Sequence, residues 1–129
     1  MLKSKSNFKL KDREKYQSQR QLKVSQLIGA AVIDCLMKGK RVDIRLIPMP
    51  LTITKVNISA DLKVANCYFL PFNTNLSRDE ILEALEESKY IIRQYVTKEI
   101  NLKYSPEIRF HYDQAFENAA KIDLLLNKL

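Results

Sequence analysis

The chain has 129 residues, of which 46% are hydrophobic, and a formal net charge of +7 at pH 7. This length fits a single domain built around one core. No apolar run approaches the roughly 20 residues of a membrane-spanning helix, and no secretory signal follows Met1, so we expect a soluble, cytoplasmic protein with no membrane partner.

The two cysteines, Cys35 and Cys67, lie in apolar segments and form no Cys-x-x-Cys pair. This arrangement predicts neither a disulfide framework nor a zinc site. With glycine only at Gly29 and Gly39, a phosphate-binding glycine loop is also excluded. We therefore expect no metal and no other cofactor, and two small buried thiols in a reducing compartment.

Most of the positive charge is concentrated at the N-terminus. Residues 1–23 contain eight Lys or Arg and two acidic residues, whereas residues 24–129 carry a net charge of only +1. Residues 1–15 show no sustained apolar period, which predicts a flexible basic arm followed by a folded domain over 16–129. Such an arm favours a polyanionic partner. The alternative is a solvated tail that only aids solubility.

The first predicted helix begins near Tyr16. Its apolar positions recur with the helical period and comprise Leu22, Val24, Leu27, Ile28, Ala31, Val32, Cys35 and Leu36. Gly29 lies inside this helix, where glycine is less favourable than alanine by about 1 kcal/mol, so it indicates a close packing contact. Gly39 suits a left-handed C-terminal cap and predicts the end of the helix.

Two strands are predicted after a connector over 40–50. Pro48 and Pro50 exclude a regular helix or a central strand in that connector. Residues 51–59 are rich in β-branched side chains, and residues 63–69 form a return strand. The short turn between the two strands predicts antiparallel pairing.

A long helix is predicted from Ser77, because Ser77 and Glu80 have the spacing of a capping box. Its apolar residues follow the helical period, namely Ile81, Leu82, Leu85, Ile91, Ile92, Tyr95 and Val96. Acidic residues fill its first half and basic residues its second half, which complements the helix macrodipole. The least apolar part of its buried face is Ser88-Lys89-Tyr90.

A third strand is predicted where Ile108, Phe110 and Tyr112 alternate with polar residues. Asp113 can cap a final helix, whose apolar residues are expected to dock it on the domain, namely Phe116, Ala119, Ala120, Leu124 and Leu125. Helices must cover the apolar side of the sheet, which predicts a two-layer α+β domain. A monomer is expected, since one core uses these apolar faces.

Two blocks of the chain carry a resemblance to a known family. The first is the strand–turn–strand segment Lys55–Tyr68, with Ser, Asp-Leu and Ala at matching places. The second runs from Ile91-Ile92-Arg93 through Pro106-Glu107-Ile108-Arg109-Phe110-His111-Tyr112-Asp113 to Ala120-Lys121-Ile122-Asp123-Leu124-Leu125. Over about residues 16–127 the sequence resembles the ribosome-binding factor A family, bacterial factors in maturation of the small ribosomal subunit.

The resemblance implies a single type II KH-like domain, in the order helix, strand, strand, helix, kink, helix, strand, helix. In this family an Ala-x-Gly kink replaces the Gly-x-x-Gly loop of ordinary KH domains. Here Ser88-Lys89-Tyr90 stands at that position. Tyr90 in place of glycine implies either a milder kink or a bend made by Ser88 bonding back to a carbonyl.

The resemblance also implies a function. Family members are non-catalytic assembly factors that bind free 30S small ribosomal subunits and 16S rRNA during late maturation and processing of that subunit. It further implies release with the help of a GTPase. The chain is accordingly expected to be a ribosome- and RNA-binding protein and no enzyme.

The candidate rRNA-binding residues are those at the kink, along the basic half of the helix and near the N-terminus. They are Arg20, Ser88, Lys89, Tyr90, Arg93, Lys98 and Lys103. Lys89 and Arg93 are four residues apart and share a helix face, and Tyr90 or Tyr104 could stack on an unpaired base. Two alternatives to RNA binding remain open. The charges could serve only to complement the helix macrodipole and to aid solubility, and the tyrosines could be half-buried with their hydroxyl groups in contact with water.

A different hypothesis is a small RNA-binding hydrolase or nuclease that uses His111 and Asp113. Their spacing puts both side chains on one face of a strand. Catalysis would also need a nucleophile or a metal, and none is marked, which favours a structural or surface role for His111. A protein–protein adaptor that uses the acidic half of the long helix is a third hypothesis.

Overall fold

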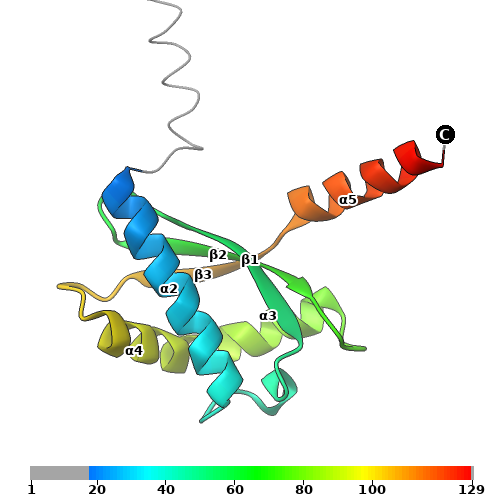
Figure 1. Cartoon of the computed structure of the whole chain (residues 1–129). Helices are drawn as coiled ribbons and strands as arrows, with labels where there is room; N and C mark the ends of the chain where they lie inside the picture. The colour runs from blue at the N-terminus through cyan, green and yellow to red at the C-terminus, as the bar shows by residue number, and fades with distance from the viewer. Residues whose placement is uncertain (1–17, 129) are drawn as a thin grey trace, which may run out of the picture.

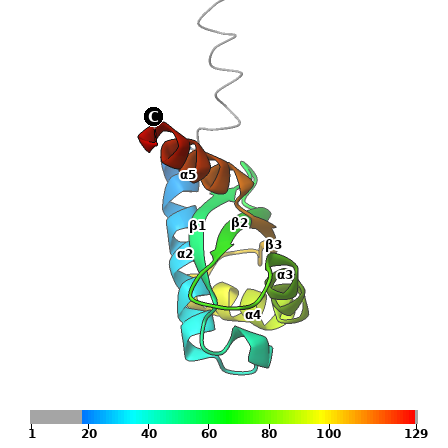
Figure 2. The same ribbon diagram turned by 90° about the vertical axis from the view of Figure 1, so that its right-hand side faces the viewer.

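The computed structural model describes residues 18–128, which form an α+β domain (Figure 1, Figure 2). Its elements are α2 (Gln19–Lys38), the 3-10 turn η1 (Ile44–Leu46), β1 (Leu51–Ile58), β2 (Val64–Pro71), α3 (Arg78–Glu87), α4 (Lys89–Ile100), β3 (Glu107–Tyr112) and α5 (Gln114–Asn127). This is the predicted order of elements. The predicted arm over 1–15 lies outside the described residues. Within residues 18–128, every helix is too short or too polar to cross a bilayer.

Helix α2 begins at Gln19, three residues after the expected Tyr16, and its N-terminus has a capping box formed by Ser18 and Gln21. It ends as predicted at Gly39, which has a left-handed φ of 65°. Gly29 faces β1, where an added Cβ would lie 3.2 Å from Cγ2 of Val56. The close contact predicted for Gly29 is therefore present, and it brings α2 down onto the sheet.

We expect Gly39→Ala to lower the free energy of unfolding by about 1–2 kcal/mol, because a left-handed backbone is unfavourable by that amount for a residue with a Cβ. The added Cβ would also lie 3.1 Å from Cγ1 of Ile47. Chemical denaturation measures the change. Gly39→Asn is the control, since asparagine tolerates this conformation better. Equal losses in the two variants would contradict the explanation.

The sheet has the order β1-β2-β3. Strands β1 and β2 pair antiparallel, as predicted, and β3 joins β2 in parallel after the crossover through α3 and α4. A bulge between Ile53 and Lys55 interrupts the first pairing, so that Lys55 lies opposite Tyr68. The bulge leaves Thr54 out of the register and lets its hydroxyl turn toward Asp113.

One face of the sheet packs on the helices. All three strands contribute inward side chains that are at most 4% exposed, namely Leu51, Ile58, Ala65, Cys67, Phe69, Ile108 and Phe110. They form one core with apolar residues of α2, α3 and α4, which lie together on this side (Figure 2). The predicted two-layer arrangement is confirmed for these three helices.

Helix α5 departs from the prediction. It contains no buried residue and projects away from the sheet after β3 (Figure 1). Asp113 holds its first turn by accepting a hydrogen bond from Phe116 N–H, as expected. The expected docking is wrong, because the apolar side chains of Phe116, Leu124 and Leu125 remain 56%, 62% and 64% exposed.

Candidate RNA-binding surface

The kink between α3 and α4 is made by Ser88 alone. Its φ of −94° and ψ of 0° are accessible to any L-residue, so Tyr90 stands inside α4 and needs no left-handed conformation. The Ser88 hydroxyl accepts a hydrogen bond of 2.8 Å from Asp43 N–H. Ser88 therefore links the kink to the connector after α2, and a bond from its hydroxyl back to a helix carbonyl is not among the contacts of the described residues.

This geometry corrects one predicted contact residue. Ser88 is only 2% exposed, so its side chain is not on the surface where an RNA would touch it. Its role is to position the residues on either side of the kink.

A cluster of charged groups holds the connector on α3. The Arg45 guanidinium lies 3.0 Å from Asp43, 3.4 Å from Glu83 and 3.2 Å from Glu87. The hydrogen bonds from Arg45 hold the pKa of Asp43 well below its usual range. The carboxyl thus stays ionised at neutral pH, and the connector is fixed beside the kink.

A groove of about 750 Å³ lies between the turn that follows α2 and the exposed side of α4. Four cationic side chains and two tyrosines are among its lining residues, namely Lys40, Arg41, Arg93, Lys98, Tyr90 and Tyr95. Tyr90 is 68% exposed, so the half-buried alternative is wrong for this residue. Positive charge beside an exposed aromatic ring is the combination that binds single-stranded nucleic acid.

The floor of the groove is tied to α2 through Tyr95. Its hydroxyl donates to Asp34, and Lys38 Nζ donates to the same hydroxyl at 2.8 Å. Lys38 also lies 3.1 Å from the Asp34 carboxylate. The hydrogen bond to Asp34 raises the pKa of Tyr95, so the phenol remains a neutral donor at physiological pH.

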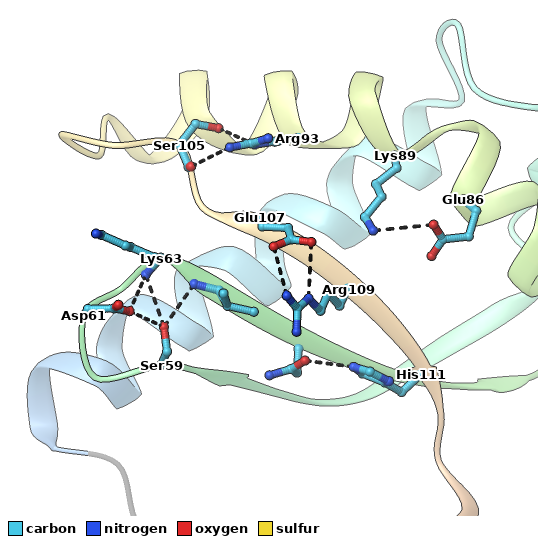
Figure 3. A network of polar contacts seen from close by, with 12 residues as sticks. Ser59, Asp61, Lys63, Glu86, Lys89, Arg93, Ser105, Glu107, Arg109 and His111 are labelled. Atoms are coloured by element: carbon cyan, nitrogen blue, oxygen red, sulfur yellow. Dashed lines mark hydrogen bonds and ion pairs between the residues drawn. The ribbon is translucent and has the colours of Figure 1, made fainter.

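Arg93 connects the groove to the loop before β3 (Figure 3). Its Nε and Nη2 donate to the hydroxyl and the carbonyl of Ser105, both at 2.9 Å. Lys89 lies 3.4 Å from Glu86. Hydrogen bonds from Arg109 lower the pKa of Glu107, and the charges of Lys89 and Arg93 add to this effect. The positive charges of Lys89 and Arg93 therefore stabilise the ionised carboxylate of Glu107 at the start of β3.

The remaining predicted residues lie elsewhere. Arg20 and Lys103 line a separate hollow of about 300 Å³, together with Tyr104. Tyr104 is 66% exposed, so it is not half-buried either. The loop over 101–106 separates this hollow from the groove, because Ser105 lines the groove and Lys103 lines the hollow. The structure thus brings together Tyr90, Arg93 and Lys98.

Lys40 and Arg41 are groove residues that the sequence reasoning missed. Both follow Gly39, and Arg41 itself has a positive φ of 66°. The signal was present in the predicted left-handed cap, since a sharp turn there sends the next residues back past the end of α2.

His111 and Asp113 do not form the pair that a hydrolase would need. His111 Nε2 lies 2.8 Å from Asn66 Oδ1, whereas Asp113 is buried, caps α5 and accepts from Thr54. Burial acts to raise the pKa of Asp113, but hydrogen bonds from Thr54 and Phe116 N–H outweigh it and leave that pKa lowered. The two side chains thus serve separate structural contacts.

Both cysteine thiols are buried. Burial raises the pKa of the Cys67 thiol to about 12 and raises that of Cys35, so both stay protonated. Within residues 18–128, no group of three His, Cys, Asp or Glu side chains is placed to hold a metal ion.

Comparison with known sequences supports the resemblance. A model of the family described as ribosome-binding factor A matches residues 20–126. A ribosome-binding factor A of Rickettsia felis is 53% identical over 120 residues, which are 93% of this chain and 100% of that protein. One from Rickettsia bellii is 58% identical over 109 residues, covering 84% of this chain and 89% of the relative.

Solved structures share the fold. The NMR structure of a Thermotoga maritima protein is 27% identical, with a TM-score of 0.63, over 74% of this chain and 89% of that one. A homology model of Thermus thermophilus ribosome binding factor A, fitted into the cryo-EM map of its complex with the 30S subunit, is 16% identical with a TM-score of 0.52, over 74% of this chain and 93% of that one. The KH-like α+β architecture predicted from the sequence is confirmed.

Proposed function

Because the chain belongs to the ribosome-binding factor A family, we propose that it is an assembly factor that binds free 30S subunits and 16S rRNA during late maturation and processing of the small subunit. It acts in the cytoplasm as a monomer and leaves the subunit with the help of a GTPase. The domain over 16–129 makes the main contact, and the basic arm over 1–15 adds positive charge.

The observation that carries this proposal is the basic groove beside the kink. Lys40, Arg41 and Lys98 line the same groove as Tyr90, whose side chain is exposed. Phosphate oxygens of RNA suit the cations, and an unstacked base suits the ring. The same domain carries further positive charge outside the groove, on Lys89, Arg20 and Lys103.

We propose that the chain does no chemistry on the RNA. Its work is differential affinity: it binds one local RNA conformation more tightly than others and so raises the population of that conformation. The separate partners of His111 and Asp113 support this view.

Co-sedimentation of the full chain with free 30S subunits and with 70S ribosomes tests the proposal. We expect it to pellet with free small subunits at about 50 mM salt and much less at about 200 mM, because neutralised phosphates release counterions. The 16S rRNA should remain intact on a denaturing gel. Failure to pellet at low salt would refute the binding proposal, and cleaved rRNA would refute the non-catalytic one.

A further inference from the structure

The outer face of the sheet, opposite α2, α3 and α4, has its own pattern of side chains. Lys55, Tyr68 and His111 are register partners on β1, β2 and β3, so they form one row across the sheet. The flanking inward residues Cys67 and Phe69 are fully buried, which places this row on the opposite face. No helix packs over this face in residues 18–128, because α5 projects away after β3 (Figure 1).

The three side chains of this row contact one another. Lys55 Nζ lies 4.5 Å from the centroid of the Tyr68 ring. The Tyr68 and His111 rings have centroids 5.1 Å apart, with planes inclined by 31°. Asn66 fixes the imidazole through its Oδ1, which is 2.8 Å from Nε2. The result is a cation and two aromatic rings on an uncovered sheet surface.

An ordinary cross-strand pair would account for the two rings alone. Two further features favour a ligand. The bulge after Ile53 puts Lys55 opposite Tyr68 in place of the neutral Thr54. Arg109, one row along, adds a second cation that is about half exposed, with two 3.2 Å hydrogen bonds to Glu107 (Figure 3).

The outer row also continues the basic surface described above. Glu107 lies at the start of β3, and its carboxylate interacts with the charges of Lys89 and Arg93 from α4 as well as with that of Arg109. Figure 3 shows Lys89 and Arg93 on the helix beside β3, with Arg109 and His111 following along the strand. Cationic side chains are therefore present on both sides of the β3 edge, with Lys89 and Arg93 on α4 and Arg109 on the outer face of the sheet.

We propose that the Lys55–Tyr68–His111 row is a second contact surface for single-stranded RNA, distinct from the groove beside the kink. An unpaired base stacks on the Tyr68 and His111 rings, and Lys55 and Arg109 bind the adjoining phosphates. The inference rests on the proposed function, since it takes RNA as the ligand. It gives the domain two RNA contacts on different layers.

The test compares Tyr68→Leu with Tyr68→Phe, which keeps the aromatic face. The probe is a fluorescent, unstructured RNA of about ten nucleotides, a length within the range of single-strand sites. We expect Tyr68→Leu to weaken binding about tenfold, as for the loss of one stacked base, and Tyr68→Phe to bind within about twofold of the natural chain. Equal affinity of the leucine variant and the natural chain would overturn the proposal.

A crosslinking experiment on the unmodified chain removes any dependence on variant folding. RNA that carries 4-thiouridine is irradiated in the complex, and crosslinked peptides are identified by mass spectrometry. Crosslinks within β2 or β3 are expected. Crosslinks confined to α4 and the loop over 101–106 would overturn the proposal.

Binding to 30S subunits separates the possible failures. In the first case the natural chain binds subunits, and the variants Tyr68→Leu and Lys55→Gln bind both the oligonucleotide and the subunits as tightly as the natural chain does. Only the second contact surface is then refuted. If these variants lose subunits but keep the oligonucleotide, this face contacts a subunit protein and the RNA proposal is wrong. If the natural chain does not bind subunits at all, the proposed function and this inference fail together.

Discussion

Replacing Lys40, Arg41 and Lys98 together by glutamine is expected to lower the affinity for 30S subunits roughly hundredfold near 0.2 M salt. All three cations line the groove around Tyr90, and each is expected to neutralise one phosphate. The dependence of log affinity on log salt should also become shallower by about three, one for each phosphate that the variant no longer neutralises. Co-sedimentation over a range of salt concentrations measures both quantities.

The matched control removes three positive charges elsewhere. Lys23, Lys121 and Lys128 are exposed residues of α2, α5 and the end of α5, and their replacement by glutamine gives the same net charge. If general attraction were sufficient, both triple variants would lose the same affinity. A groove that binds RNA directly requires a much larger loss in the first variant, so equal losses would refute this location.

Replacing Phe69 by alanine is expected to lower the free energy of unfolding by about 3–5 kcal/mol. Phe69 lies on the central strand β2, is completely buried and packs edge-on against Tyr112 with ring centroids 6.1 Å apart. Its removal leaves a cavity at the centre of the core, which the surrounding strands cannot close. Urea denaturation measures the difference.

The chain offers a matched control three residues away. Phe72 is 62% exposed just after β2, so Phe72→Ala should change stability by less than about 0.5 kcal/mol. The same chemical change is thus made at a buried and at an exposed position. A large loss at Phe72, or a small loss at Phe69, would mean that the core is not centred on β2.

Features set by neighbouring residues could be predicted from the sequence. The capping box of Ser77 and Glu80 is present, with hydrogen bonds of 3.2 and 3.3 Å, and Gly39 ends α2 in a left-handed conformation. The alternation in β3 also produced the expected inner and outer faces. In each case a hydrogen bond or a steric preference within a few residues determines the structure.

Features set by distant residues were harder to predict. The sequence predicts a surface role for Ser88 and not its burial, because the partner of its hydroxyl, Asp43 N–H, lies 45 residues earlier in the chain. The apolar residues of α5 predict docking, but the path of the chain after β3 carries the helix away from the sheet, and the sequence around α5 does not determine that direction. Lys40 and Arg41 join Lys98 only through the packing of α2 on α4.

That packing has a thermodynamic consequence for recognition. The two walls of the groove are held by side chains with at most 3% exposure, namely Val32 and Cys35 from α2 and Ile92 and Val96 from α4. Close-packed interiors resist deformation, so the position of α2 relative to α4 on either side of the groove is fixed in the free domain. Under the proposed function, such preorganisation would leave the conformational adjustment to the RNA. An rRNA segment that already has the complementary shape would then bind without that penalty, and the domain would distinguish one stage of rRNA folding from the next.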